Sequence, residues 1–342
     1  GIIAGKFPTQ YDHPFATIGD LVAEIKSGRC RPFFKEIPKA GSNIVVTEVT
    51  MGTKGADESR ERIILKRYKQ ESKWKKLKAS LRIMEGLHEK GLGGGAYRIP
   101  KVIDVNDEEN VLIEEGQRGR KLYDLLLRVD PDVGKEYLRM SAKWLARFHG
   151  ASLDVSSAAK TRKKEEKRFR SYLSAFADTG SPYLKDAEEL IDFVKSGEGT
   201  VFEQRSSRFV QNHGDYHPKN IIIGQDLMQD ISTMFVSVID FDSSLLFSRC
   251  FDVGYFLAQF RNQFISMPDI AARYPEEVFL EAYMSETDVN DRPAFLREVD
   301  LFKIRAALSI AAFLIKVGKG ESPEMRSLID SSTSTLRTLQ RA

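Results

Sequence analysis

Two neighbouring stretches, FVQNHGDYHPKNIIIG at residues 209–224 and FVSVIDFDSS at residues 235–244, decide the interpretation of this sequence. Their polar residues stand at the borders of apolar, strand-like runs, where a charge is unfavourable unless it has a partner. Asp215 and Asn220 are joined by a loop short enough to turn both side chains to one side. Asp240 ends a run that can lie beside the isoleucines after Asn220. We expect a hairpin on which these three side chains converge.

Carboxylate and amide oxygens are the hard ligands that Mg²⁺ prefers, and this ion commonly bridges to phosphate oxygens. The three residues therefore predict a magnesium ion and a bound nucleotide. A triphosphate also needs positive charge, and Lys66 in the strand-like RIILKRY segment, residues 62–68, is placed to supply it. Arg67 and Lys69 compete for this role, because strand alternation alone does not choose among them.

Patterns of apolar residues divide the chain into two parts. In the first part they indicate strands, except at residues 15–25 and 71–90, where they are spaced as in amphipathic helices. From Lys121 the period is helical, and we interpret the charged run at 160–170 as a solvated helix face. We expect a nucleotide-binding N-lobe over residues 1–115, built from a small antiparallel sheet and one long helix. A mostly helical C-lobe is expected over residues 116–342.

The expected elements of the first part can be given by residue. A short helix is expected at 15–25, and strands at 33–37, 44–51, 63–65, 98–105 and 110–116. The buried face of the long helix should carry Trp74, Leu77, Leu81, Met84 and Leu87.

Length and composition bound the answer further. The 342 residues are enough for two domains, and 52 Lys and Arg against 49 Asp and Glu leave a net charge of +3, which gives no reason to expect nucleic acid or a membrane as partner. The 2 cysteines lie far apart, as is usual in a reducing compartment. No apolar stretch approaches the roughly 20 residues of a membrane span, and we see no secretory signal. We therefore expect a cytoplasmic protein.

HGDYHPKN followed by IDFD resembles the aminoglycoside phosphotransferase and choline kinase family, whose members share an α+β, bilobal, protein-kinase-like fold. The likeness extends from about Phe33 to the C-terminal helices. It implies that Asp215 is the catalytic base and that Asn220 and Asp240 hold Mg²⁺. It also implies that Lys66 contacts the α- and β-phosphates of ATP or GTP, and that the C-lobe holds the catalytic loop and the acceptor pocket.

The same resemblance implies further roles. The backbone around Glu114 to Gly116 would be the hinge that binds adenine, and the loop KAGSN at 39–43, with Gly41 and Ser42, would cover the phosphates. His213 would be a structural member of the catalytic loop. Asp252, in FDVGYF, resembles the acid that braces this loop from a following helix.

The sequence also departs from the family. The acid on the long helix that should pair with Lys66 is not obvious, because Ser80 stands about seven residues before Leu87. Glu71 and Glu85 remain as candidates, and we favour Glu85.

Spacing indicates the class of acceptor. Only eleven residues separate Asp240 from Asp252, too few for the activation segment of a protein kinase. We therefore expect transfer of the γ-phosphoryl group to a hydroxyl of a small molecule. The alternatives are a non-catalytic, kinase-like nucleotide-binding module and a kinase that acts on protein or another macromolecule.

Acidic residues of the C-lobe could attract a cationic acceptor or could equally face solvent: Glu276, Glu277, Glu281, Glu286, Asp288 and Asp291. The pattern predicts no oligomeric state.

Overall fold

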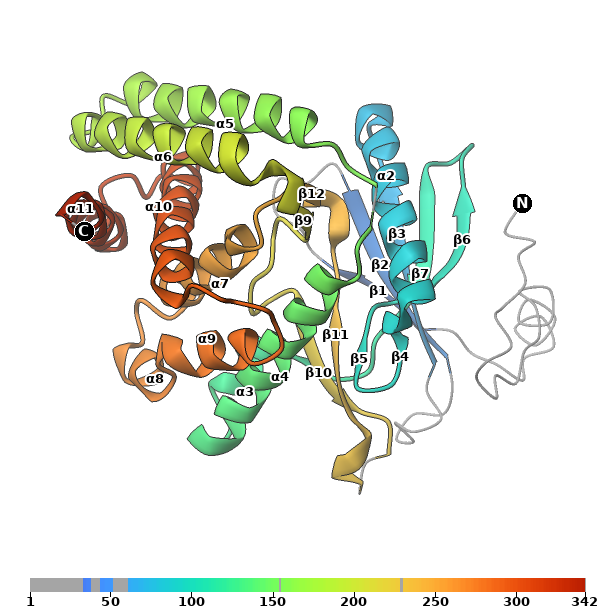
Figure 1. The fold of residues 1–342 in the computed structure, drawn as a ribbon. Coiled ribbons are helices and arrows are strands. Elements are labelled where there is room, and N and C mark those ends of the chain that lie inside the picture. Colours follow the sequence, from blue (N-terminus) through green and yellow to red (C-terminus); the bar gives the residue numbers. More distant parts are fainter. Residues whose placement is uncertain (1–32, 38–43, 52–60, 154, 228–229, 342) are drawn as a thin grey trace. The chain divides into compact units, whose positions relative to one another are not determined.

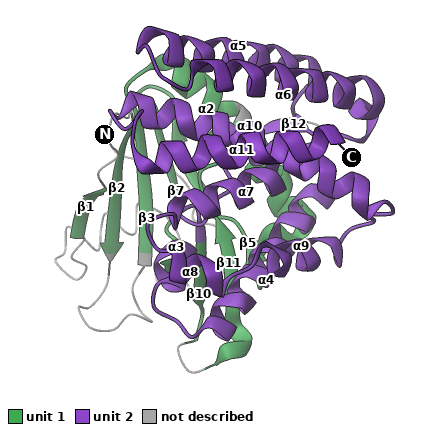
Figure 2. Cartoon of the chain, turned by 90° about the vertical axis from the view of Figure 1, so that its left-hand side faces the viewer, with its two compact units in different colours: residues 1–120, 222–242 green, residues 121–221, 243–342 purple. Residues whose placement is uncertain are grey.

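The computed structural model describes residues 33–37, 44–51, 61–153, 155–227 and 230–341. The chain divides into two compact units (Figure 2), one of residues 1–120 and 222–242 and the other of residues 121–221 and 243–342. The first unit contains nearly all of the strands and the second nearly all of the helices (Figure 1). The expected bilobal α+β fold is therefore confirmed. The expected helix at 15–25 and loop at 39–43 lie outside the described residues.

Two sheets make up the first unit. One has the strand order β1-β2-β3-β7-β6, with each neighbouring pair antiparallel. The other has the order β4-β5-β11-β10-β8, and β11 pairs with β5 in parallel. Because β10 and β11 belong to this second sheet, residues 222–242 are part of the first unit although they come late in the chain. The strands are β1 (Phe33–Ile37), β2 (Ile44–Met51), β3 (Glu61–Tyr68), β4 (Gly93–Gly94), β5 (Tyr97–Arg98), β6 (Val102–Asn106), β7 (Val111–Glu115), β8 (Arg120–Lys121), β10 (Ile221–Gln225) and β11 (Met234–Val238).

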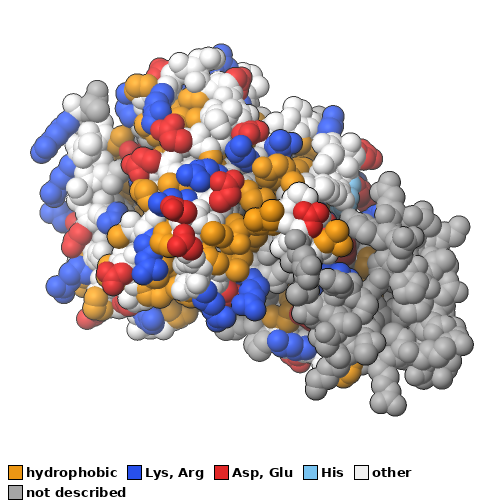
Figure 3. All heavy atoms as spheres, turned by 90° about the horizontal axis from the view of Figure 1, so that it is seen from below, with side chains coloured by type: hydrophobic (Ala, Val, Ile, Leu, Met, Phe, Trp, Pro, Cys, Tyr) orange, Lys and Arg blue, Asp and Glu red, His pale blue; other side chains and the backbone are white. Residues whose placement is uncertain are grey.

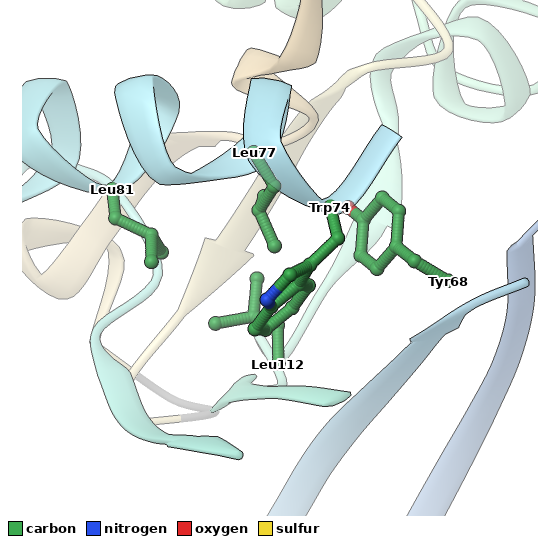
Figure 4. Close-up of a cluster of buried hydrophobic side chains, with 5 residues drawn as sticks. All are labelled: Tyr68, Trp74, Leu77, Leu81 and Leu112. Carbon is green, nitrogen blue, oxygen red and sulfur yellow. The ribbon is translucent and has the colours of Figure 1, made fainter. Parts of the chain in front are cut away.

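Helix α2 (Glu71–Leu87) covers the first sheet with the apolar face that the sequence predicts. Its side chains Trp74, Leu77 and Leu81 reach toward Leu112 of β7 (Figure 4), and all are buried. The Trp74 indole N–H donates to the Asp107 carboxylate at 2.8 Å, which satisfies its polar atom at the edge of the cluster. A single π turn, η2 (His88–Leu92), follows the helix.

The second unit is built around one long helix. Helix α10 packs against α7, α6, α5 and α11, and its side chains are buried on most sides. Gly254 allows α7 to approach α10 closely, because a Cβ there would lie 2.7 Å from the Val299 carbonyl oxygen. The helices are α3 (Leu122–Leu126), α4 (Pro131–Gly150), α5 (Ala158–Asp178), α6 (Leu184–Arg205), α7 (Cys250–Gln263), α8 (Pro268–Arg273), α9 (Glu276–Met284), α10 (Arg292–Lys316) and α11 (Pro323–Arg341), with the strand pair β9 (Val210–Asn212) and β12 (Leu245–Phe247). The described residues also contain the short 3-10 turns η3 (Ser206–Arg208), η4 (Ile231–Thr233) and η5 (Phe241–Ser243).

The interpretation of residues 160–170 as a solvated helix face is wrong for one of its charged residues, Glu165, and Thr161 and Phe169 of the same run are buried as well. Glu165 of α5 is only 1% exposed, and its carboxylate accepts hydrogen bonds from the guanidinium of Arg305 at 2.8 and 2.6 Å. Arg168 bonds to the other carboxylate oxygen at 2.5 Å. Helix α5 packs on α10, which supplies Arg305, so one acidic residue of the charged run faces inward to a buried partner. The neighbouring Glu166 is exposed, as interpreted.

We expect Glu165→Gln to lower the free energy of unfolding by about 3–5 kcal/mol, because it leaves the buried Arg305 without its charged partner. Glu166→Gln is the matched control, one residue along the same helix, and should change stability by no more than about 0.5 kcal/mol. Urea unfolding of both variants measures the difference. Equal stability of the two variants would contradict a buried ion pair at Glu165.

Candidate active site

The loop from His213 to Asn220 depends on a glycine. Gly214 has φ of 79°, in the left-handed region that residues with a Cβ rarely adopt. A Cβ at this position would also overlap the backbone carbonyl of Ser243. The second residue of the HGD motif can therefore be neither arginine nor another L-residue without a rearrangement of the loop.

Asp252, in the first turn of α7, binds the backbone of this loop with its side-chain carboxylate. Its Oδ2 accepts the N–H of His213 at 2.6 Å, and its Oδ1 accepts the N–H of Gly214 at 2.9 Å. The carboxylate is fully buried, so its charge depends on these donors. The buried His213 ring in turn accepts the N–H of Asp215 at 3.2 Å through Nδ1.

His149, at the end of α4, supplies a third donor to Asp252, which sequence reasoning missed. Its Nε2 lies 3.3 Å from Asp252 Oδ2, and its Nδ1 lies 2.7 Å from the hydroxyl of Tyr283. Because a carboxylate only accepts, Nε2 carries the proton and Nδ1 accepts from the tyrosine. Burial lowers the pKa of His149 despite the neighbouring carboxylate, which keeps the ring neutral. No local pattern in the sequence links these residues, since the bonds span more than a hundred positions.

The Asp215 carboxylate is surrounded by donors of the second unit. Its Oδ1 accepts from the Tyr255 hydroxyl at 2.7 Å and lies 3.6 Å from Nε2 of His217. Its Oδ2 accepts from Nδ2 of Asn220 at 3.2 Å. Burial by itself raises the pKa of Asp215, but His217 and then Tyr255 outweigh burial, and the net pKa is lowered. Asp215 is therefore an ionised, pre-oriented hydrogen-bond acceptor at neutral pH.

A second set of charged side chains lies in the first unit, around Lys66. Lys66 is 9% exposed as a residue, and its ammonium forms an ion pair with the Glu114 carboxylate of β7 at 2.8 Å. Arg67 and Lys69 are both exposed, so the burial pattern distinguishes Lys66 from its two competitors. Burial lowers the pKa of Lys66, but surrounding carboxylates outweigh it and the net pKa is raised. These are, in order of effect, Glu114, Asp240 and Asp242.

The favoured pairing of Lys66 with Glu85 is not what the structure contains. Glu85 lies on the exposed side of α2, and Lys66 is paired with Glu114 instead. Glu71, the other candidate, pairs with Lys75 of its own helix at 2.7 Å. The reason is the register of the sheet: Lys66 lies opposite Leu112 on the neighbouring strand, so an acid two residues along β7 is on the same face.

Ser80 explains why α2 lacks an inward acid. It is 4% exposed, and its hydroxyl donates to the backbone carbonyl of Phe241 at 3.1 Å. A carboxylate cannot make this bond, because it only accepts at neutral pH. The Tyr68 hydroxyl bonds to Asp242 Oδ2 at 3.2 Å. Helix α2 and the end of β3 thus hold the segment that contains Asp240.

Asp240 has φ of 73°, a strained conformation for a residue other than glycine. Such backbone strain persists only where the surrounding structure imposes it, and it gathers at functional sites. The segment after β11 is held at two points next to Asp240: the Phe241 carbonyl accepts from Ser80, and the Asp242 carboxylate accepts from Tyr68.

The expected nucleotide contacts of the hinge and the phosphate loop have different outcomes. Gly41 and Ser42 lie outside the described residues. The N–H of Glu115 donates to the Lys101 carbonyl, and that of Gly116 to the Arg62 carbonyl, both at 2.8 Å. These two amides are therefore engaged within the sheet, and an adenine contact near Gly116 must use other backbone groups.

The donor set fits a magnesium ion by its chemistry. Asp240 in the first unit and Asn220 in the second each offer a hard oxygen atom of the kind that Mg²⁺ prefers. In the first unit the carboxylates of Glu114, Asp240 and Asp242 act on the ammonium of Lys66, an excess of negative charge that a divalent cation would balance. Within the described ranges, no group of three or more His, Cys, Asp or Glu residues is already arranged to hold a metal ion.

Among those same residues, no helix is both long enough and apolar enough to cross a membrane.

Comparison with known proteins agrees with a kinase-like phosphotransferase. The model of a family described as "Phosphotransferase enzyme family" matches residues 53–283. This match covers more than half of the chain, so the chain belongs to that family. The resemblance expected from the sequence is thereby confirmed. No curated protein matches the chain significantly.

Solved structures share the fold over nearly the whole chain. A choline kinase from Cryptosporidium parvum aligns with a TM-score of 0.61 at 13% identity, covering 93% of this chain and 92% of that one. The streptomycin-ATP-APH(2")-IIa ternary complex gives 0.55 at 15% identity, covering 92% and 96%. An ethanolamine kinase from Plasmodium vivax gives 0.52 at 17% identity, covering 94% and 84%. At these identities the likeness establishes the fold.

We expect Gly214→Ala to lower the free energy of unfolding by at least about 2 kcal/mol, because an L-residue is strained at this φ and its Cβ overlaps the Ser243 carbonyl. Gly199→Ala is the control: it lies inside α6 with open space where its Cβ would lie, and alanine there should leave stability unchanged or raise it by up to about 1 kcal/mol. Urea unfolding compares the two. A Gly214 variant as stable as the Gly199 variant would disprove the constraint.

We expect Glu114→Gln to destabilise the protein by about 1–3 kcal/mol, because the buried Lys66 loses its nearest charge partner. Glu85→Gln should have an effect within about 0.5 kcal/mol, since Glu85 is exposed. Thermal unfolding of the two variants, each compared with the unsubstituted chain, tests which acid supports Lys66. Greater destabilisation by the Glu85 substitution would reverse the assignment.

Proposed function

We propose that this protein transfers the γ-phosphoryl group of ATP or GTP to a hydroxyl group of a small molecule, with Mg²⁺ as cofactor. The observation that carries the proposal is the Asp215 carboxylate, ionised and held by Tyr255 and Asn220 in a loop that Asp252 ties to α7. Family membership supports phosphotransfer. Structural neighbours include choline and ethanolamine kinases and aminoglycoside phosphotransferases, and some of these structures contain ADP, ATP or GDP.

In this proposal Asp215 aligns the acceptor. Phosphoryl transfer passes through a loose transition state in which the hydroxyl proton leaves late, so catalysis comes mainly from positioning and charge neutralisation. The Tyr255 hydroxyl donates to Oδ1 of Asp215, and His217 lies near the same oxygen. Asn220 donates to Oδ2. Each carboxylate oxygen has two lone pairs, so Oδ2 retains one for the acceptor hydroxyl. The lowered pKa of Asp215 keeps this oxygen available at neutral pH.

The donor nucleotide would be held by the remaining predicted residues. Lys66, kept charged by its carboxylate neighbours, binds the α- and β-phosphates. Asn220 and Asp240 would hold Mg²⁺, which would supply positive charge to neutralise the phosphates. Glu114 keeps the Lys66 ammonium in place. The backbone near residues 114–116 contacts the base in the proposal, through groups other than the two engaged amides.

The acidic residues of the C-lobe supply no argument for a cationic acceptor. Most of those considered from the sequence are already neutralised within the second unit. Acidic and basic side chains are likewise interspersed on the face shown in Figure 3. The partners are Lys303 for Glu276, Arg292 for Glu281, Lys143 for Glu286 and Arg249 for Asp288, while Asp291 caps α10 by accepting the N–H of Ala294. We therefore propose a small acceptor that carries a hydroxyl group, and we assign no charge to it.

A screen of acceptors tests the function directly. The protein is incubated with ATP or GTP, Mg²⁺ and amino sugars, amino alcohols or sugars in turn, and release of ADP or GDP is measured. We expect release that depends on one acceptor class and stops when EDTA removes the metal. Nucleotide binding with no transfer to any acceptor in a broad panel would instead identify a non-catalytic module, and transfer only to protein extracts would identify a macromolecular kinase.

We expect Asp215→Asn to lower turnover by about two to four orders of magnitude, the range by which positioned acid–base groups accelerate reactions. The KM for the nucleotide should stay near that of the unsubstituted protein, because Asp215 is assigned to the acceptor and not to the phosphates. Steady-state kinetics with the acceptor from the screen give both values. Full activity of this variant would refute the role of Asp215.

A further inference from the structure

Helix α7 carries a row of polar side chains that ends at Asp215. Tyr255, Gln259 and Gln263 are spaced by four residues and so lie on one face of the helix. Nε2 of Gln263 lies 3.5 Å from Oε1 of Gln259, and Nε2 of Gln259 donates to the Tyr255 hydroxyl oxygen at 3.1 Å. The Tyr255 hydroxyl donates to Asp215 at 2.7 Å. The mechanism above gives Gln259 and Gln263 no part.

The direction of these bonds follows from the chemistry of the groups. A carboxylate only accepts, so the single proton of the Tyr255 hydroxyl must point to Asp215. The hydroxyl oxygen is then an acceptor, and Gln259 must turn its amide nitrogen toward it. Burial, and then the charge of Asp215, raise the pKa of Tyr255, so the hydroxyl keeps its proton. Gln259 thus fixes the direction in which Tyr255 donates.

Tyr255 also stands one helical turn after Asp252, which bonds to the backbone of the same loop. One turn of α7 therefore holds the loop at two places. Asp252 accepts from two backbone amides of the loop, and Tyr255 donates to the side chain of Asp215. Tyr255 is 8% exposed, so water competes little for this bond. A carboxylate fixed at Oδ1 by a rigid helix presents Oδ2 in one orientation.

We propose that Tyr255 is a positioning residue for phosphoryl transfer: with its hydroxyl oriented by Gln259, it locks one oxygen of the Asp215 carboxylate and so aims the other at the acceptor hydroxyl. This inference rests on the proposed function. It assigns no contact between Tyr255 and the reacting atoms, and its effect passes entirely through Asp215. The acceptor and nucleotide therefore bind equally well without the hydroxyl, while fewer bound complexes are aligned for transfer.

Tyr255→Phe removes only the hydroxyl, and it is tested with the acceptor found in the screen. We expect kcat to fall by roughly ten- to a hundredfold, the range of a hydrogen bond to a charged group, with the KM for nucleotide within about twofold of the unsubstituted protein. Tyr274→Phe is the matched control, because Tyr274 is also buried and its hydroxyl donates to the Leu126 carbonyl at 3.2 Å. It should keep full kcat. Thermal unfolding of both variants checks that they fold.

A double-mutant cycle separates positioning from a general structural effect. In the Asp215→Asn background, Tyr255→Phe should cause no further loss of kcat, because its only route of action is already removed. Gln259→Met, which keeps the helix and the tyrosine, should lower kcat by about threefold, since the donated proton is less firmly directed; it also serves if the phenylalanine variant does not fold.

The outcomes are distinct. Unchanged kcat in the Tyr255 variant, an equal loss in the Asp215→Asn background, or an equal loss in the Tyr274 control each overturns the positioning role while leaving the proposed function intact. If Tyr255→Phe does not fold, unchanged kcat in Gln259→Met overturns that role. A wild-type protein that transfers no phosphoryl group under any condition of the screen overturns both proposals together.

Discussion

The arrangement of the second unit depends on one buried carboxylate. Asp252 is completely excluded from solvent, where an unpaired charge would be prohibitively unfavourable. Its charge is stabilised by two backbone amides and by the ring of His149, and these donors exist only when the loop, α7 and the end of α4 are in place. The requirement that this charge be satisfied therefore determines the path of the loop that carries Asp215. Gly214 is the residue that allows the backbone to follow that path.

The two units prepare opposite kinds of electrostatic environment. Around Lys66, acidic groups are in excess, and the ammonium remains charged although it is buried. Around Asp215, donors are in excess, and the carboxylate remains ionised although it too is buried. In both cases the described partners come from the same unit as the group they stabilise. Each group is thus oriented before any ligand arrives, which is the condition under which fixed charges are most effective in catalysis.

The sequence predicted those features that depend on local pattern. The strands of the first sheet and the buried face of α2 follow from periodicity, whereas short strands such as β4 and β8 were not predicted. The motif containing Asp215, Asn220 and Asp240 was recognisable because its members lie within a few residues of apolar strands. The sequence was less informative about which charged residues pair with one another. Glu114 in place of Glu85 depends on strand register, and the inward turn of Glu165 depends on Arg305, which lies 140 positions away. His149 and Tyr255 were missed for the same reason, since neither carries a local signal of the bond that it makes.

The discontinuous first unit has a consequence for the order of events during synthesis. Its second sheet includes β10 and β11, which are translated only after about a hundred residues of the helical unit have left the ribosome. The N-terminal part of a chain usually folds first as it emerges. Here the sheet that includes β4 and β5 stays incomplete until residues 234–238 have been added. A nascent chain truncated at residue 120 would therefore leave the edge of β5 that pairs with β11 without its partner strand, and unpaired strand edges favour association with other chains.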